Sequence, residues 1–318
     1  MPLPSDEKIV ALAEELLKEF DVIFGEHPGF RPTHAKGTML SGTFRPAKDA
    51  ASLTRAPQFA RESTPVVVRF SDTTGIPTIP DNDPNANPRG MGIRFMLAEH
   101  VHTDIIGHST PEFPVQNGAD FLGFLKAIAS GDPSAFIGSH PAAAVFVKSM
   151  RTPSSFARAA YFPISAFRFT NKDGVSRFGR YRIMPEAGVE LLDDATSKSK
   201  DANYLFEDLT RRISEGAVNF DIFVQVANDN DVVNDATIHW PEDRALVNLG
   251  KITLTAKVPD DAHEQKKIIF DPLPRVDGIE PSDDPLLELR AALYLLSGRR
   301  RRGAPESAVD ARPAKAGG

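Results

Sequence analysis

The sequence predicts an α+β fold built on an eight-stranded antiparallel β-barrel with flanking helices. Eight segments have the length, the β-branched and aromatic content and the bounding turn residues of strands. They fall into two groups of four separated by helix-like segments, and no repeat of fixed period is found. Eight such strands favour one barrel over two separate sandwiches. The segments are residues 37–45, 65–70, 91–97 and 101–106, then 165–170, 176–184, 218–226 and 249–257.

Helices are expected at both ends of the chain and between the strands. The first residues, MPLPSDEKIVALAEELLKEF, predict an amphipathic helix with Ser5 as its N-cap. Near the end, DPLLELRAALYLLSGRRR predicts a helix with Pro285 in its first turn and Gly298 just past its last turn. The stretch 72–90 is dense in Pro, Asn and Asp and is expected to form a long connection. The other expected helices are residues 118–130, 140–150 and 203–215.

Composition and charge argue against several classes of protein. The 318 residues carry a formal net charge of −6 and give a pI of about 5.8, whereas nucleic-acid binders are usually basic. No apolar run approaches the roughly 18 residues of a membrane span, and the N-terminus lacks the pattern of a secretory signal. The absence of cysteine excludes disulfides, thiolate-bound metals and cysteine nucleophiles. We therefore expect a cytoplasmic protein that binds neither nucleic acid nor membranes.

Two short motifs carry side chains suited to chemistry, and each has a structural alternative. In RPTHAKG, residues 31–37, His34 could cap the following strand or could transfer protons in a pocket. On the last helix, Arg290 and Tyr294 stand four residues apart and share a face. Tyr294 could be a core residue beside a surface arginine. Alternatively, the guanidinium would favour the ionised phenol, and a phenolate can hold ferric iron in a haem.

Six motifs occur in an order that resembles the haem catalase family. They are RPTHAKG, VRFSDTTG, NPRGMGIRF, GHSTP, FDPLPRVDGIEPSDD and RAALY. The resemblance runs from about residue 25 to residue 301, and the ordered set is far more specific than any single motif. It implies a single catalase-like haem-binding domain over residues 1–301, with the last helix similar to the family's proximal haem helix. Residues 302–318 are expected to form a disordered, charged tail.

The resemblance also implies roles for residues on the distal side of the haem. His34 matches the histidine that takes a proton from one peroxide oxygen and returns it to the other. Ser71 matches the serine that orients this imidazole. His108 stands where the family has an asparagine that helps to position peroxide. This departure predicts inefficient disproportionation of hydrogen peroxide.

On the proximal side, Tyr294 matches the phenolate that binds iron, and Arg290 matches its charge partner. Arg301 lies at the matching seven-residue step after Tyr294, but the run Arg299–Arg302 leaves the choice among these arginines open. The other expected haem contacts are Arg31 and Arg69 to the propionates, and Thr33 and Phe121 against the porphyrin.

The short chain resembles the small catalase-related peroxidase branch, because the extensions of larger catalases are absent. This implies a peroxidase with haem b and ferric iron. It would reduce hydrogen peroxide and organic hydroperoxides with small organic electron donors, and would retain weak catalase activity. A homodimer or a higher homo-oligomer is also implied. The alternatives are a true catalase, a haem hydroperoxide isomerase or lyase, and a non-enzymatic haem store or sensor, which would not need the pair of His34 and Ser71.

Overall fold

The computed structural model describes residues 2–306 and has the predicted α+β fold. Nine strands form one antiparallel sheet in the order β11-β6-β7-β9-β10-β1-β2-β3-β4. All eight predicted strands are present. The additional strand, β11, has three residues, too few for an alternating pattern to be recognised. The strands are β1 (Gly37–Pro46), β2 (Thr64–Ser71), β3 (Gly90–Ala98), β4 (Val101–His108), β6 (Phe167–Thr170), β7 (Ser176–Pro185), β9 (Val218–Val226), β10 (Leu246–Lys257) and β11 (Ile279–Pro281), with β5 (Thr152–Pro153) and β8 (Leu191–Leu192) forming a second small sheet.

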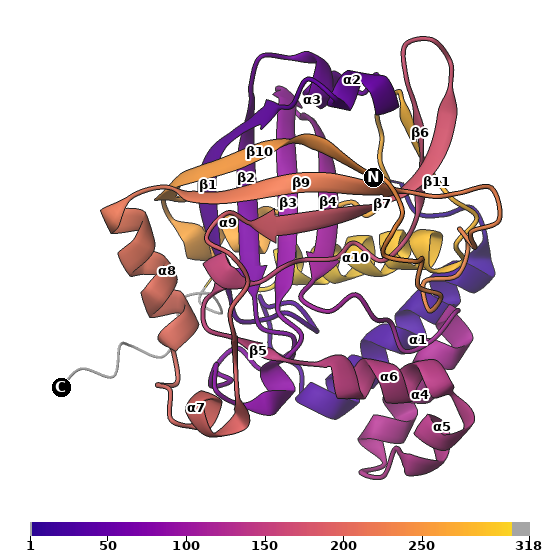
Figure 1. The fold of residues 1–318 in the computed structure, drawn as a ribbon. Helices are drawn as coiled ribbons and strands as arrows, with labels where there is room; N and C mark the ends of the chain where they lie inside the picture. Colours follow the sequence, from indigo (N-terminus) through magenta and orange to yellow (C-terminus); the bar gives the residue numbers. More distant parts are fainter. Residues whose placement is uncertain (1, 307–318) are drawn as a thin grey trace.

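An irregular segment brings the two flanks of the large sheet together. Phe162 donates its backbone N–H to the carbonyl of His108 at the end of β4 (2.8 Å), and Tyr161 donates to Ile183 in β7 (2.9 Å). Figure 1 shows the resulting curl, with β1 to β4 running across the direction of β7, β9 and β10. This arrangement agrees with the predicted antiparallel barrel. Two bridges, in place of full strand pairing, connect its flanks.

Aromatic side chains fill the interior of the curled sheet. The ring centroids of Phe156, Tyr161 and Phe220 lie 5.5, 6.0 and 5.8 Å from that of Phe70. All four side chains belong to one buried cluster with the inward-facing residues of β9. Because the interior of a small barrel is packed in this way, a ligand site must lie outside this core.

Three helices make a second core beside the barrel. α1 (Glu7–Phe24), α4 (Gly118–Ala129) and α10 (Leu286–Gly303) bury Leu16, Leu125 and Leu289 against one another. The N-cap of α1 is Asp6, which accepts from the backbone N–H of Lys8, and not the predicted Ser5. None of the described helices is long and apolar enough to cross a membrane. The remaining helices are α2 (Ala50–Leu53), α3 (Pro57–Ala60), α5 (Ser134–Ser139), α6 (Pro141–Ser149), α7 (Asp194–Lys198), α8 (Tyr204–Glu215) and α9 (Asp261–Lys267).

The last helix is longer than predicted. Gly298 lies inside α10 and is buried against Ile269. A Cβ at this position would overlap the side chain of Ile269. The glycine therefore allows close packing and does not end the helix. α10 continues through Gly303, two residues past the predicted domain boundary. The remainder of the predicted tail, residues 307–318, lies outside the described residues.

We predict that Gly298→Val lowers the free energy of unfolding by about 1–3 kcal/mol, because the added side chain overpacks the contact with Ile269. The matched control is Gly303→Val in the last turn of α10, where nothing lies within 4 Å of an added Cβ. Urea denaturation of the two variants measures the difference. Equal stability would contradict the role assigned to Gly298.

Candidate active site

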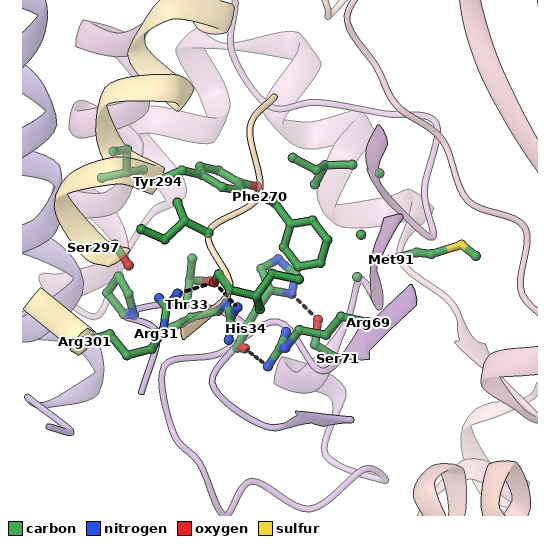
Figure 2. A pocket seen from close by; sticks show the side chains of 18 residues that line it. Arg31, Thr33, His34, Arg69, Ser71, Met91, Phe270, Tyr294, Ser297 and Arg301 are labelled. Carbon is green, nitrogen blue, oxygen red and sulfur yellow. Dashed lines mark hydrogen bonds between the residues drawn. The ribbon is translucent and has the colours of Figure 1, made fainter. Parts of the chain in front are cut away.

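A cavity of about 100 Å³ lies between α10 and the strands β2 to β4, and Figure 2 shows its lining side chains. It adjoins a larger cavity of about 800 Å³ that extends toward α1, α4 and α6. The two cavities share Thr33, His34, Ile106, Leu293 and Tyr294. Seven of the ten predicted site residues line the smaller cavity. The other three, His108, Phe121 and Arg290, line only the larger one.

Four residues form a row across the first four strands of the sheet. Gly37 pairs with Ser71, Ser71 with Gly90, and Gly90 with His108. Directly opposed residues in antiparallel strands project toward the same face, and neighbouring strands lie about 4.8 Å apart. The row therefore places Ser71 and His108 on the same face, on either side of a position without a side chain.

The imidazole of His34 occupies the space over Gly90. A Cβ at Gly90 would lie 2.7 Å from His34 Nδ1 and 2.6 Å from Ser71 Oγ, closer than atoms can pack. His34 Nδ1 lies 3.1 Å from Ser71 Oγ, within hydrogen-bond distance. The backbone of His34 has a φ of 59°, which is uncommon for a residue other than glycine, and its N–H donates to Thr73 at 2.7 Å. His34 is thus held in a fixed position, a feature that is common at functional sites.

Burial sets the charge of this imidazole. Desolvation, together with the positive charge of Arg69, lowers the pKa of His34 from 6.5 to about 3. His34 is therefore neutral near pH 7. A neutral imidazole can take a proton from a bound molecule and return it, which is the chemistry of a general acid–base group.

Three guanidinium groups border one end of the cavity. Arg31 donates to the carbonyls of Gln265 (3.2 Å) and Ile268 (3.1 Å), and Arg301 donates to the carbonyl of Lys266 (3.0 Å). Arg69 donates to the carbonyl of His34 at 2.8 Å. Burial lowers the pKa of Arg31 to about 10, and burial together with the charge of Arg31 lowers the pKa of Arg301. Positive charges gathered at a buried edge favour a ligand with negative groups.

One face of α10 supplies the opposite wall. Tyr294, Ser297 and Arg301 are spaced by three and four residues, so they project together into the cavity (Figure 2). In the preceding turn, the guanidinium of Arg290 lies 6.0 Å from the ring centroid of Tyr294, at cation–π distance. The predicted pair therefore shares a face. Figure 2 places Tyr294 and His34 on opposite sides of the cavity.

His108 and Phe121 line the larger cavity instead. The ring of His108 stacks on Phe113 (centroids 6.3 Å apart) and meets Phe146 edge-on (6.5 Å). Both ring nitrogens of His108 are buried and make no hydrogen bond of normal geometry to a described residue, although the backbone of Thr110 is close enough to oppose the lowering of the His108 pKa. Burial lowers the pKa of His108 to about 4, with a further contribution from the charge of Arg290. Phe121 packs on Phe113 at 5.7 Å.

Buried ion pairs hold the long connection 72–90 in place. Asp72 pairs with Arg89, and Lys36 pairs with Asp81 at 2.5 Å. Burial raises the pKa of Asp72 to about 7, against the opposing effect of the Arg89 charge. The connection, predicted only as a long loop, therefore forms a fixed wall of the larger cavity.

Several lining residues received no role from the sequence. Gly90 and Met91 lie in the NPRGMGIRF motif, and Phe270 lies in the FDPLP motif. The motifs marked these segments, but the close approach of His34 to Gly90 depends on strand register. Ser297 had a usable signal, because it stands three residues after Tyr294 on a predicted helix.

Comparisons with known proteins give a consistent result. The family model described as catalase matches residues 15–312. A protein of Synechococcus elongatus named catalase-related peroxidase is 35% identical over 303 residues, covering 91% of this chain and 89% of its own length. A protein of the same name from Mycolicibacterium paratuberculosis is 33% identical over 293 residues, covering 89% of this chain and 93% of its own length.

Solved structures agree with the sequence relatives. A bacterial catalase has a TM-score of 0.75 and 26% identity, with 98% of this chain and 64% of the catalase chain covered. A fungal catalase has a TM-score of 0.76 at 22% identity, with 86% and 60% covered. The likeness thus extends over nearly all of this chain and a smaller share of the solved ones.

The depressed pKa of His34 predicts acid sensitivity of the fold. The unfolded chain binds a proton at His34 below about pH 6.5, whereas the folded protein does so only near pH 3. The contribution of His34 to the free energy of unfolding is therefore fully present above about pH 6.5. It is lost as the pH falls from there toward about 3, by roughly 1 kcal/mol per pH unit. Urea denaturation at several pH values should show a shallower dependence for His34→Gln. His100→Gln, which changes a side chain that is 92% exposed, is the control. Identical pH dependence of His34→Gln and the unchanged protein would contradict this account.

Proposed function

The chain belongs to the catalase family, and we propose that it is a haem peroxidase that reduces hydrogen peroxide and organic hydroperoxides with small organic electron donors. One observation carries the proposal. A phenol, Tyr294, faces a neutral imidazole held by Ser71 across a cavity bordered by guanidinium groups. A phenolate ligand for iron and a distal acid–base group are the two parts that peroxide chemistry on haem requires.

The residues present fit a haem. The walls between Tyr294 and His34 include Met91, Phe270 and Leu293, which suit an apolar macrocycle. At one end, Arg31, Arg69 and Arg301 would hold the propionates, and these carboxylates would offset the cost of burying three positive charges. Arg301 is favoured for this role because its neighbours do not line the cavity. Arg299 is exposed, Arg300 pairs with Asp21, and Arg302 donates to the carbonyl of Lys267.

We propose Tyr294 as the iron ligand and haem b with ferric iron as the cofactor. The positive charge of Arg290 beside the ring of Tyr294 would favour the phenolate over the phenol. The redox chemistry of peroxide cleavage is supplied by the haem when it is bound. Thr33, in the cavity wall beside His34, would pack against the porphyrin, and Phe121 would do so from the larger cavity.

His34 would move the peroxide proton. Its imidazole is neutral near pH 7 and would accept a proton from one oxygen of the peroxide and return it to the other. Ser71, at hydrogen-bond distance from Nδ1, would keep the ring oriented during the transfer. Gly90 leaves the space in which the ring stands.

The larger cavity supports a peroxidase acting on organic molecules. Its volume of about 800 Å³, part of which a haem beside Tyr294 would fill, lies within the range of small-molecule sites, and most of its lining is apolar. The two relatives named catalase-related peroxidase favour this function over a true catalase, an isomerase or lyase, or a haem store. We propose that the protein retains catalase activity but that this activity is weak, because His108 stands where the family has an asparagine. A cytoplasmic location and homo-oligomeric assembly remain predictions from the sequence.

We expect Tyr294→Phe to fold but to retain little haem, because the substitution removes the anionic ligand and leaves the cavity walls intact. The measurement is haem absorbance per mole of purified protein. Tyr181→Phe, which changes a buried tyrosine of the barrel core, is the matched control and should retain haem. Unchanged haem content and spectrum in Tyr294→Phe would place the ligand elsewhere.

We expect His34→Ala to keep haem but to react with peroxide about 10²–10⁴-fold more slowly, because general acid–base assistance is lost. Rapid mixing of the haem-loaded protein with hydrogen peroxide, followed by absorbance, gives the rate. His140→Ala, at the start of α6 where the ring stacks on Phe136, should react normally. A His34→Ala protein that reacts at the unchanged rate would overturn the assignment of His34.

A further inference from the structure

The sheet places a second histidine beside the distal one. His108 stands in the same row as Ser71 and Gly90, and the imidazole of His34 occupies the space over Gly90. His34 therefore has Ser71 on one side and, about one strand spacing away on the other side, His108. His108 is also among the groups that lower the pKa of His34.

The surroundings of His108 are those of a binding site for a neutral molecule. Both of its ring nitrogens are buried and make no hydrogen bond of normal geometry to a described residue, the approach of the Thr110 backbone to the ring being the nearest to one. Leaving such polar atoms unpaired costs free energy, so a ligand that pairs with them is favoured. Its low pKa leaves the ring neutral, with one nitrogen able to accept a hydrogen bond and the other able to donate.

The cavity around His108 is aromatic and carries little charge. Rings of Phe113 and Phe146 contact the imidazole, and Phe124 contacts Phe146 at 6.4 Å. Asp83 and Arg290 are the charged side chains in the lining apart from the histidines. Aromatic walls favour an aromatic ring, and one neutral donor–acceptor group matches a hydroxyl better than it matches an anion.

We propose that His108 binds the hydroxyl group of a phenolic electron donor and accepts its proton during oxidation. This assignment rests on the proposed peroxidase function. The O–H bond of the phenol breaks, and its proton passes to the unprotonated ring nitrogen of His108. Haem, when bound and oxidised by peroxide, would be the acceptor of the one electron. The product is a phenoxyl radical. His34 thus handles the proton of the peroxide, and His108 handles the proton of the donor.

Equilibrium binding to the haem-loaded protein tests the contact without turnover. The probes are 4-methoxyphenol and 1,4-dimethoxybenzene, which lacks the hydroxyl proton. In His108→Leu, the affinity for 4-methoxyphenol should fall about 5- to 100-fold, because a buried hydroxyl loses its partner. The affinity for 1,4-dimethoxybenzene should change much less. Equal losses for both probes would overturn the proposed hydrogen bond.

Rates of donor oxidation test the proton transfer. The protein is first mixed with peroxide and then with either 4-methoxyphenol or ferrocyanide, which gives an electron but no proton. The ratio of the two rates should fall at least 10-fold in His108→Leu, since proton acceptance contributes about 10²–10⁴-fold. His102→Leu, on the same strand β4 but outside both cavity linings, should leave the ratio unchanged.

A second variant separates binding from proton transfer. In His108→Gln, the amide can still bond the hydroxyl but cannot take the proton, so the preference for 4-methoxyphenol should persist while the rate ratio falls. An unchanged rate ratio in both variants would overturn the role of His108 and leave the proposed peroxidase function standing. An unsubstituted protein that does not react with peroxide would instead overturn the proposed function, and with it this assignment.

Discussion

The cavity wall that carries His34 depends on two glycines in one row of the sheet, Gly37 and Gly90. Gly90 leaves the space that His34 fills, and any Cβ there would press on both His34 and Ser71. Gly37, at the other end of the row, leaves room for the guanidinium of Arg69, which a Cβ would overlap. Because Gly37 lacks a side chain, Arg69 can donate to the carbonyl of His34. Because Gly90 lacks one, the imidazole of His34 can lie within hydrogen-bond distance of Ser71. Strand register thus determines where the imidazole of His34 stands.

The proximal side depends in the same way on close packing, here of a helix. Gly298 lets α10 contact Ile269, and the helix continues far enough to carry Arg301 into the cavity that Tyr294 lines. Arg301 and Arg31 then meet at the carbonyl of Ile268. Holding these charges together in a buried place costs free energy. A ligand with two carboxylates, such as haem, would offset this cost, which explains how an otherwise unfavourable cluster is retained.

The sequence predicted the regular elements well, because alternation and helical spacing are local signals. The roles of His34 and Tyr294 followed from a resemblance to a family and not from pattern alone, since a lone histidine or a helical tyrosine is usually structural. Three features depend on contacts between distant segments and were not predictable: the packing of Gly298 on Ile269, the strand β11, and the position of His108 in the row with Gly90. Arg301 became distinguishable from its neighbours only once the helix face was fixed.

We propose that Tyr294 and His34 hold a haem between them, with the Tyr294 phenolate bound to the iron. Resonance Raman spectroscopy of the purified, haem-loaded protein tests it most directly, with samples grown on ordinary and on ring-labelled tyrosine. Vibrations of the Tyr294 phenolate should be enhanced by excitation into the haem bands, and they should shift when the tyrosine rings are labelled. A spectrum without label-dependent bands, or one with the iron–histidine vibration of an imidazole ligand, would contradict it.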